Sequence, residues 1–198
     1  MNTLFKDAGI IEKFSEDVQG VFTLTDMKSI FPLTDPVTFY RKIKSLKNAG
    51  VLSRAVKGIY ITENFDLKTL SQKIHPESYL SFETVLAKAL IIGTIPSRQI
   101  KAVKTGKKRE YSIGENRIIH VGISKQLYFG FEKINGIKIA VKEKAFLDTL
   151  YFYLKGHIFY FDIYSDLDTS KLDMRIIEKY LGQYSNPKFK KFVRGFFT

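Results

Sequence analysis

Hydrophobic positions at the start of the chain follow helical spacing. Leu4, Ala8, Ile11 and Phe14 recur every three or four residues, which predicts an amphipathic helix over residues 3–15. A short β-type run at 21–24 follows this helix. Thr25 is expected to cap a second helix that ends near Phe31, because Pro32 comes next.

A third helix carries strong start and stop signals. Asp35 can serve as its N-cap, and Pro36 occupies the first helical position. We expect this helix to run to about Asn48, where Gly50 supplies the stop. The hydrophobic period then changes from 3.6 to 2, and the runs VLSRAV and GIYIT predict a hairpin around Lys57-Gly58.

Three helices followed by a hairpin are typical of a winged helix-turn-helix, which we predict for residues 1–62. Residues 63–75 read as a connecting helix with Leu67, Leu70 and Ile74 on one face. Residues 76–198 then form a mixed α/β domain. The predicted fold class is therefore α+β, with an N-terminal winged helix-turn-helix and an α/β C-terminal domain.

The second half alternates between the two periods. Ser81 is expected to cap a helix that includes Phe82, Val85 and Leu86. The runs that predict strands are QIKAVKT, REYSI, RIIHVGI, QLYFGFE and GIKIA. VKEKAFLDTLYFYL then predicts a helix with a buried face, and two short helices close the sequence.

Composition adds a strong basic excess to this picture. The 198 residues carry 32 Lys and Arg against 20 Asp and Glu, a net charge of +12. Such an excess favours a polyanionic partner. There are no cysteines and no run of about 18 apolar residues that could span a membrane. The stretch MNTLFKDAGIIEKF differs from a signal peptide, so we expect a cytoplasmic protein that binds no membrane.

The basic charge is concentrated on the third helix and the hairpin. Six basic residues and no acidic residue lie between Pro36 and Tyr60. On a helical wheel the packed face comprises Pro36, Phe39, Tyr40, Ile43 and Leu46. The other face can meet base edges and phosphates, and with the hairpin it gives the predicted DNA-binding set: Thr38, Arg41, Lys42, Lys44, Ser45, Lys47, Arg54 and Lys57. A solvated basic face or a protein-interaction module is the alternative.

A second basic stretch runs from Arg98 to Arg117, with seven basic residues against two acidic ones. The residues predicted to form an antitoxic or partner-binding surface there are Lys101, Lys104, Lys107, Lys108 and Arg109. This stretch could also extend a DNA footprint, bind RNA or contact an acidic partner, or it could be a solvated loop.

The sequence offers no catalytic or metal site. His75, His120 and His157 are scattered, with no partner at metal-ligand spacing. The acidic run FDIYSDLDTS lacks the ligand spacing of a calcium loop, so helix capping by Asp168 or Thr169 is the favoured interpretation. We therefore predict a protein that is not an enzyme, with no catalytic residues, metal or cofactor.

Two stretches carry a family resemblance. YLSFETVLAKALII (79–92) and KQLYFGFEKINGIKIAVKEKAFLDTLYF (125–152) resemble the C-terminal domain of AbiEi-type abortive-infection antitoxins. The matching positions are Gly136, Ile137, Ile139, Ala140, Glu143, Lys144, Ala145, Leu147 and Asp148. Phe146 stands where that family usually has Leu, and the last forty residues match no part of its pattern. Glu143, Lys144 and Asp148 are either salt-bridged helix residues, the favoured interpretation, or a functional surface.

The resemblance implies a type IV toxin–antitoxin system used in phage defence. Its antitoxin is a transcriptional repressor of its own operon, which binds inverted repeats in promoter DNA through the winged helix. Its C-terminal domain counteracts a nucleotidyltransferase-like toxin, and a stable complex is not required. The alternatives are a winged-helix regulator with a ligand-sensing domain and an RNA-binding or RNA-modifying accessory protein.

Overall fold

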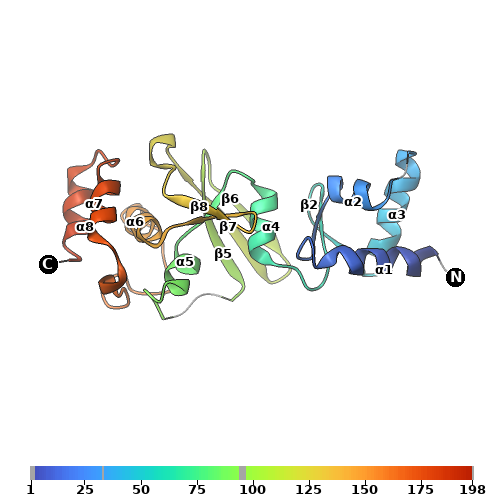
Figure 1. The fold of residues 1–198 in the computed structure, drawn as a ribbon, viewed down its shortest axis with the longest axis horizontal. Helices are drawn as coiled ribbons and strands as arrows, with labels where there is room; N and C mark the ends of the chain where they lie inside the picture. The colour runs from blue at the N-terminus through green and yellow to red at the C-terminus, as the bar shows by residue number, and fades with distance from the viewer. Residues whose placement is uncertain (1–2, 33, 94–96, 198) are drawn as a thin grey trace. The chain divides into compact units, whose positions relative to one another are not determined.

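The computed structural model describes residues 3–32, 34–93 and 97–197, which divide into two compact units, Met1–Pro76 and Glu77–Thr198. Both helices and β-sheets are present in it, so the fold class is α+β (Figure 1). No helix in the described part of the chain is long and apolar enough to cross a membrane.

The first unit combines helices with a small antiparallel sheet of strand order β1-β3-β2. Its elements are α1 (Thr3–Ser15), β1 (Val21–Thr23), α2 (Leu24–Ile30), α3 (Pro36–Asn48), β2 (Ser53–Val56), β3 (Ile59–Ile61) and α4 (Leu67–Ile74). The helix predicted over 3–15 and the helix predicted from Pro36 to about Asn48 are confirmed at these bounds. The predicted hairpin is confirmed as well, with Gly58 in its turn at φ 80°.

The predicted cap of the second helix was wrong. The cap of α2 is Thr23, because its hydroxyl accepts the Asp26 N–H while the Asp26 carboxylate accepts the Thr23 N–H. Thr25 therefore lies inside the helix. Residues 67–74 do more than connect, because α4 packs against β1 and Lys73 donates from Nζ to the Val21 carbonyl at 2.6 Å.

The core of the first unit is built from buried side chains of α1, α2, α3 and the sheet, among them Ile11, Met27 and Phe22. On α3 the buried side chains are Phe39, Ile43 and Leu46, as the wheel predicted. Tyr40 was placed on that face wrongly, since it lies one residue beyond Phe39 and 51% of it is exposed. Pro36, the first residue of α3, was also placed on the packed face but is exposed.

The second unit contains a six-stranded mixed sheet of order β6-β7-β5-β4-β9-β8, in which β4–β9 and β5–β7 are the parallel pairs. The strands are β4 (Tyr79–Leu80), β5 (Gln99–Thr105), β6 (Arg109–Ile113), β7 (Asn116–Ile123), β8 (Phe131–Ile134) and β9 (Ile137–Ala140). The helices are α5 (Glu83–Lys88), α6 (Lys142–Tyr153), α7 (Met174–Leu181) and α8 (Pro187–Arg194), with short 3-10 turns at Lys125–Leu127 and Thr169–Lys171.

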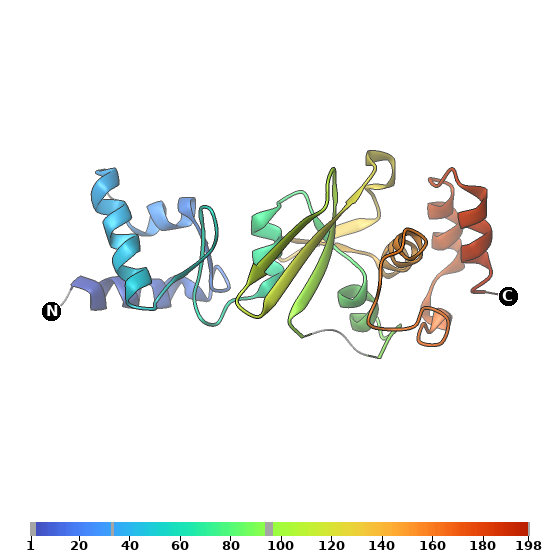
Figure 2. The ribbon, with the colours of Figure 1, turned by 180° about the vertical axis from the view of Figure 1, so that it is seen from behind.

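The helix α6 is the centre of this unit. It contacts α5, β9, α7 and α8, and Figure 2 shows it between the sheet and the last two helices. Every residue from Glu143 to Leu150 is buried. Its near-continuous burial explains why charged side chains on it need partners inside the protein.

Two predictions for the second unit were wrong in part. The run QLYFGFE is a strand only from Phe131, because residues 125–127 form a 3-10 turn. Ser81 does not cap α5. The residue at that cap is Phe82, with φ 57° and no side-chain cap, while the Ser81 hydroxyl is used elsewhere in the core. The capping role predicted for Asp168 is confirmed, since its carboxylate accepts the Ser170 N–H at 3.1 Å.

Candidate functional site

The start of α3 is fixed by its own cap. The Asp35 carboxylate accepts the backbone N–H groups of Val37 and Thr38 at 3.1 and 2.9 Å, and it also accepts the Thr38 hydroxyl. The Thr38 hydroxyl bond and the two backbone bonds hold the pKa of Asp35 below its ordinary value. Thr38 in turn accepts a hydrogen bond from Arg41 Nη2 at 3.3 Å, so the predicted contact residue Thr38 is half-buried and engaged.

The exposed face of α3 retains most of the predicted cations. Arg41, Lys44, Ser45 and Lys47 are all exposed. Within the described residues, no ion pair joins Arg41, Lys44 or Lys47 to a carboxylate. A shallow hollow of about 390 Å³ lies along this face, bounded by Leu4, Arg41, Lys44, Ser45, Asn48 and Ala49.

Lys42 points away from this surface, which corrects its assignment as a DNA contact. Its ammonium group forms an ion pair with Asp7 of α1, and only 18% of its side chain is exposed. It also lies 4.8 Å from the centroid of the Phe31 ring, in a cation–π arrangement. Lys42 therefore joins α3 to α1 and contributes little positive charge to the outer face.

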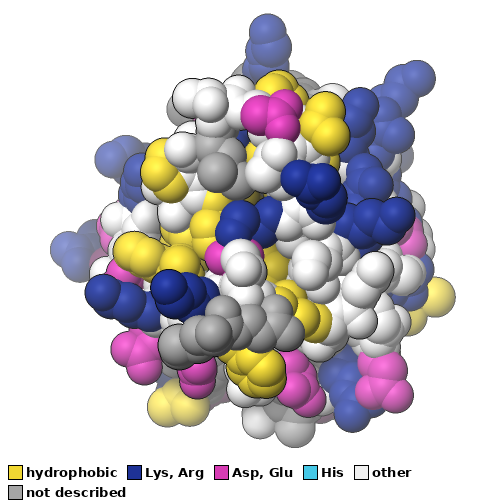
Figure 3. Space-filling model, turned by 90° about the vertical axis from the view of Figure 1, so that its right-hand side faces the viewer, with side chains coloured by type: hydrophobic (Ala, Val, Ile, Leu, Met, Phe, Trp, Pro, Cys, Tyr) yellow, Lys and Arg dark blue, Asp and Glu magenta, His cyan; other side chains and the backbone are white. Residues whose placement is uncertain are grey.

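The hairpin supplies two further cations to the first unit. Arg54 and Lys57 are exposed, and Arg54 Nε donates to the Val56 carbonyl at 3.3 Å across an irregularity in the β2–β3 register. In the view of Figure 3, dark-blue Lys and Arg side chains gather at the upper right.

In the second basic stretch, two of the five predicted surface cations are buried. Lys101 is 8% exposed and Lys104 is 5% exposed, since β5 lies inside the sheet between β7 and β4. Lys101 Nζ donates to Glu83 Oε1 at 2.7 Å and to the Ile158 carbonyl at 3.2 Å, with the Phe159 ring centroid at 4.5 Å. Neither lysine can form part of a partner-binding surface, so that assignment was wrong for both.

The other three residues of the predicted surface lie around the β5–β6 turn and are exposed: Lys107, Lys108 and Arg109. Lys108 is paired with Glu110, which also accepts a hydrogen bond from Arg117 Nη2 at 2.5 Å. The hydrogen bonds from Lys108 and Arg117 lower the pKa of Glu110 to about 2. Among the residues described, Lys107 and Arg109 form no ion pair, so the predicted antitoxic surface is reduced to these two cations.

A buried polar cluster lies against α6. The sequence indicated it only through Glu143, Lys144 and Asp148, three charged residues in an otherwise apolar helix. Lys144 and Asp148 form an ion pair with no solvent exposure. Asp148 also accepts hydrogen bonds from Tyr79 Oη at 3.0 Å and Ser81 Oγ at 2.9 Å. Burial and the neighbouring Asp148 charge raise the pKa of Tyr79 well above its ordinary value. Lys144 and Asp148 are therefore salt-bridged residues of the core, as the favoured interpretation of the sequence predicted.

Glu143 is buried too, but it serves a different contact. Its Oε1 accepts the Asp173 N–H at 3.1 Å, immediately before α7 begins. Three of the charged residues that carry the family resemblance therefore hold α6 against its neighbours.

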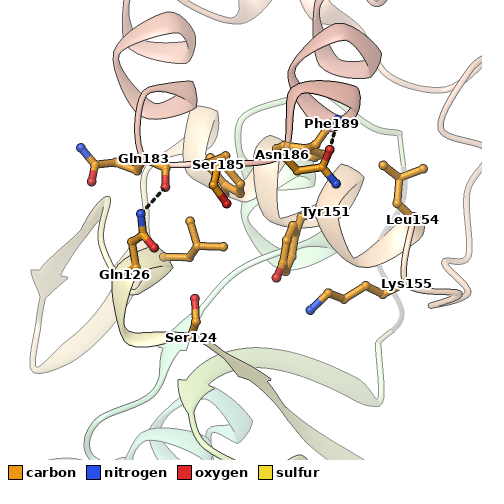
Figure 4. A pocket seen from close by; sticks show the side chains of 11 residues that line it. Ser124, Gln126, Tyr151, Leu154, Lys155, Gln183, Ser185, Asn186 and Phe189 are labelled. Carbon is orange, nitrogen blue, oxygen red and sulfur yellow. Dashed lines mark hydrogen bonds between the residues drawn. The ribbon is translucent and has the colours of Figure 1, made fainter.

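A pocket of about 330 Å³ lies beside this cluster, between α6, the residues that follow β7 and the start of α8 (Figure 4). In Figure 4 the Lys155 amine and the Tyr151 hydroxyl both point into it, and Lys155 Nζ is 4.3 Å from the Tyr151 ring centroid. Gln126 Nε2 donates to the Gln183 carbonyl at 3.1 Å across one wall. No local pattern in the sequence indicates this pocket, because its walls come from three separate segments within residues 124–189.

Comparisons with known proteins support the fold. No family model and no curated protein matches the chain. Among solved structures, the chain is similar to the Rv2827c protein from Mycobacterium tuberculosis, with a TM-score of 0.61 and 13% identity. That likeness covers 96% of this chain and 74% of the other. At this identity, the two proteins share a fold and nothing further follows.

Proposed function

We propose that the first unit is a winged helix-turn-helix that binds double-stranded DNA. In this assignment α2 and α3 form the helix-turn-helix, and the β2–β3 hairpin forms the wing. The observation that carries the proposal is the outer face of α3, where exposed cations have no acidic residue among them. A helix with its apolar side packed and its basic side outward has the form that enters a major groove.

The exposed residues of α3 and the hairpin would then make different contacts with the DNA. Arg41 and Ser45 are suited to base edges, because a guanidinium and a short hydroxyl both form directional hydrogen bonds. Lys44 and Lys47 are suited to the phosphates on either side. Arg54 and Lys57 would contact the neighbouring backbone or the minor groove from the hairpin.

The same proposal makes the chain an antitoxin and a repressor of its own operon, with promoter DNA carrying inverted repeats as its ligand. This part rests on the resemblance of residues 79–92 and 125–152 to AbiEi-type antitoxins. The second unit would counteract a nucleotidyltransferase-like toxin, and a stable complex with it would not be required. Lys107 and Arg109 are its remaining electrostatic candidates, since Lys101 and Lys104 are buried.

Co-expression with the product of the neighbouring gene, with growth as the readout, tests the antitoxin. Rescue from a toxin encoded beside this chain supports the proposal, and a neighbouring gene whose product is not toxic contradicts it. The DNA-binding part is tested separately, by titrating the upstream promoter duplex with the parent and with Arg41→Ala/Lys44→Ala. Equal affinity of the two proteins would rule out α3 as the recognition helix.

The pocket of Figure 4 favours a second candidate, a winged-helix regulator that senses a small ligand. Its volume of about 330 Å³ lies in the range of small-molecule sites, and its amine, hydroxyl and amide groups could orient a polar ligand. This candidate predicts that promoter affinity changes with a metabolite and that the neighbouring gene encodes no toxin.

A further inference from the structure

A second groove, of about 690 Å³, lies between residues 164–169 and α8 and shares no lining residue with the pocket of Figure 4. Its walls combine aromatic rings and ammonium groups. Tyr164, Phe192 and Phe196 supply the rings, and Lys188 and Lys191 supply the cations. The proposed functions above make no use of it.

The rings form a fixed platform with one side in solvent. Tyr164 lies parallel to Phe196, with 8° between the planes and 5.7 Å between the centroids. Phe196 meets Phe192 edge to face at 5.4 Å, so the base of the platform is braced. Tyr164 remains 65% exposed, although its backbone is held by a hydrogen bond of 2.7 Å from its N–H to Asp162 Oδ1. An exposed ring that lies parallel to a second ring offers its outer face to a flat partner.

The cations result from the amphipathic pattern of α8. Phe189 and Val193 are buried on its inner face, which leaves Lys188 and Lys191 on the outer side. Neither lysine is in an ion pair within the described residues. The groove is therefore positively charged as well as aromatic.

The carboxylates of the adjoining loop, Asp162, Asp166 and Asp168, accept hydrogen bonds from N–H groups of the loop itself. Asp162 accepts the N–H groups of Tyr164 and Ser165, and Asp166 accepts the N–H of Asp162 at 2.8 Å. All three carboxylates are thus turned to the loop backbone, and none of them lines the groove.

We propose that this groove binds single-stranded nucleic acid, with an unpaired base stacked on Tyr164 and the adjacent phosphates on Lys188 and Lys191. Aromatic faces next to cations are the common means of holding single strands, because every base offers a π-face and every nucleotide a phosphate. A duplex keeps its bases stacked on one another, so it cannot use the Tyr164 face. An acidic peptide would use the lysines but leave the ring platform without a flat partner.

The test uses the full chain with Arg41→Ala and Lys44→Ala, so that binding by α3 contributes little. The probe is a fluorescein-labelled, mixed-sequence RNA of about 12 nucleotides, followed by anisotropy at several salt concentrations. Tyr164→Ala should weaken binding about tenfold, and Tyr164→Phe should bind like the parent because the ring is kept. Lys188→Ala/Lys191→Ala should lower the salt slope by about 0.7 for each lost phosphate contact.

A charge-matched control separates the groove from general attraction. Lys125→Ala/Lys179→Ala removes the same charge from exposed positions outside the groove and should leave affinity within about twofold of the parent. Thermal melts of all variants check that each is folded. The proposal is overturned if Tyr164→Ala binds the RNA like the parent, if the control pair loses as much affinity as the groove pair, or if duplex RNA binds as tightly as the single strand. Preferential binding of a tyrosine-containing, glutamate-rich peptide would likewise overturn it in favour of a peptide site.

Discussion

Lys144 donates a hydrogen bond to Asp148 one turn further along α6, with 2.5 Å between Nζ and Oδ1, and neither side chain is exposed to solvent. The other oxygen of Asp148 is bound by Tyr79 and Ser81, while Lys144 reaches Tyr184 Oη at 3.3 Å and lies 4.8 Å from the Phe129 ring centroid. The pair therefore joins α6 to β4 and to the segment before α8.

Removing one member of this pair should destabilise the second unit strongly. Lys144→Met leaves the Asp148 carboxylate buried without its cation, and such changes cost about 3–5 kcal/mol. Urea-induced unfolding of the two proteins at neutral pH measures the difference. Lys133→Met, at an exposed position on β8, is the matched control and should change stability by less than about 0.5 kcal/mol. An unchanged midpoint for Lys144→Met would show that the ion pair is dispensable.

Lys101, one of the two buried lysines of β5, leads to a related prediction that separates fold from function. Lys101→Ala leaves Glu83 buried without its partner and should also cost about 3–5 kcal/mol. Lys107→Glu/Arg109→Glu changes only exposed residues and should keep the parent's thermal midpoint.

The Lys107→Glu/Arg109→Glu variant can be used in the growth assay to test the antitoxic surface. If Lys107 and Arg109 form the antitoxic surface, the charge-reversed protein should still bind the promoter yet fail to rescue growth from the toxin. Full rescue by the well-folded variant would place the antitoxic surface elsewhere in the second unit.

The elements that the sequence predicted best are those whose signals are local. Asp35 and Pro36 lie at the start of α3 and fix its first turn, and the strand runs at 99–105 and 109–113 match β5 and β6. Such signals depend on neighbours within one turn or one strand.

Side-chain partners were much harder to predict, because they come from distant parts of the chain. Lys42 lies 35 residues from Asp7, and Lys101 lies 58 residues from Phe159. A helical wheel gives the direction of a side chain but does not say which group meets it there. Lysines that looked like surface cations are therefore buried or half-buried in ion pairs.

The inner face of α3 should determine the stability of the first unit. Ile43 is 3% exposed, and its change to Ala should cost about 2–5 kcal/mol because it leaves a cavity in the core. Tyr40→Ala, three residues earlier on the exposed side, should cost less than about 1 kcal/mol. Thermal and urea unfolding of both variants decide between the two faces, and a larger loss from Tyr40→Ala would mean that the orientation of α3 is wrong.

The two lysines on opposite sides of α3 should differ in DNA binding. Lys44 is exposed, so Lys44→Ala should lower the salt slope of promoter binding by about 0.9, the value for one phosphate contact. Lys42→Ala should leave that slope unchanged and reduce stability instead, since Lys42 is paired with Asp7. Equal slopes for the two variants would contradict the inward placement of Lys42.

Glu110 provides a test of the charge balance around the β5–β6 turn. The hydrogen bonds from Lys108 and Arg117 lower its pKa from an ordinary value of 4.5 to about 2. A depressed carboxyl pKa stabilises the folded state at pH values above 4.5, and the contribution is lost as the pH falls from 4.5 towards 2. The contribution is small because these groups are exposed and solvent screens them.

Side-chain NMR titration of Glu110 in the folded protein measures this pKa directly. Lys108→Ala/Arg117→Ala should return the midpoint towards 4.5, because both donors are removed. The stability difference between the parent and Glu110→Gln should shrink over the same pH window, since the parent carboxylate becomes protonated there. A midpoint near 4.5 in the parent would mean that Glu110 holds neither cation, which would leave Lys108 and Arg117 available to an anionic partner beside Lys107 and Arg109.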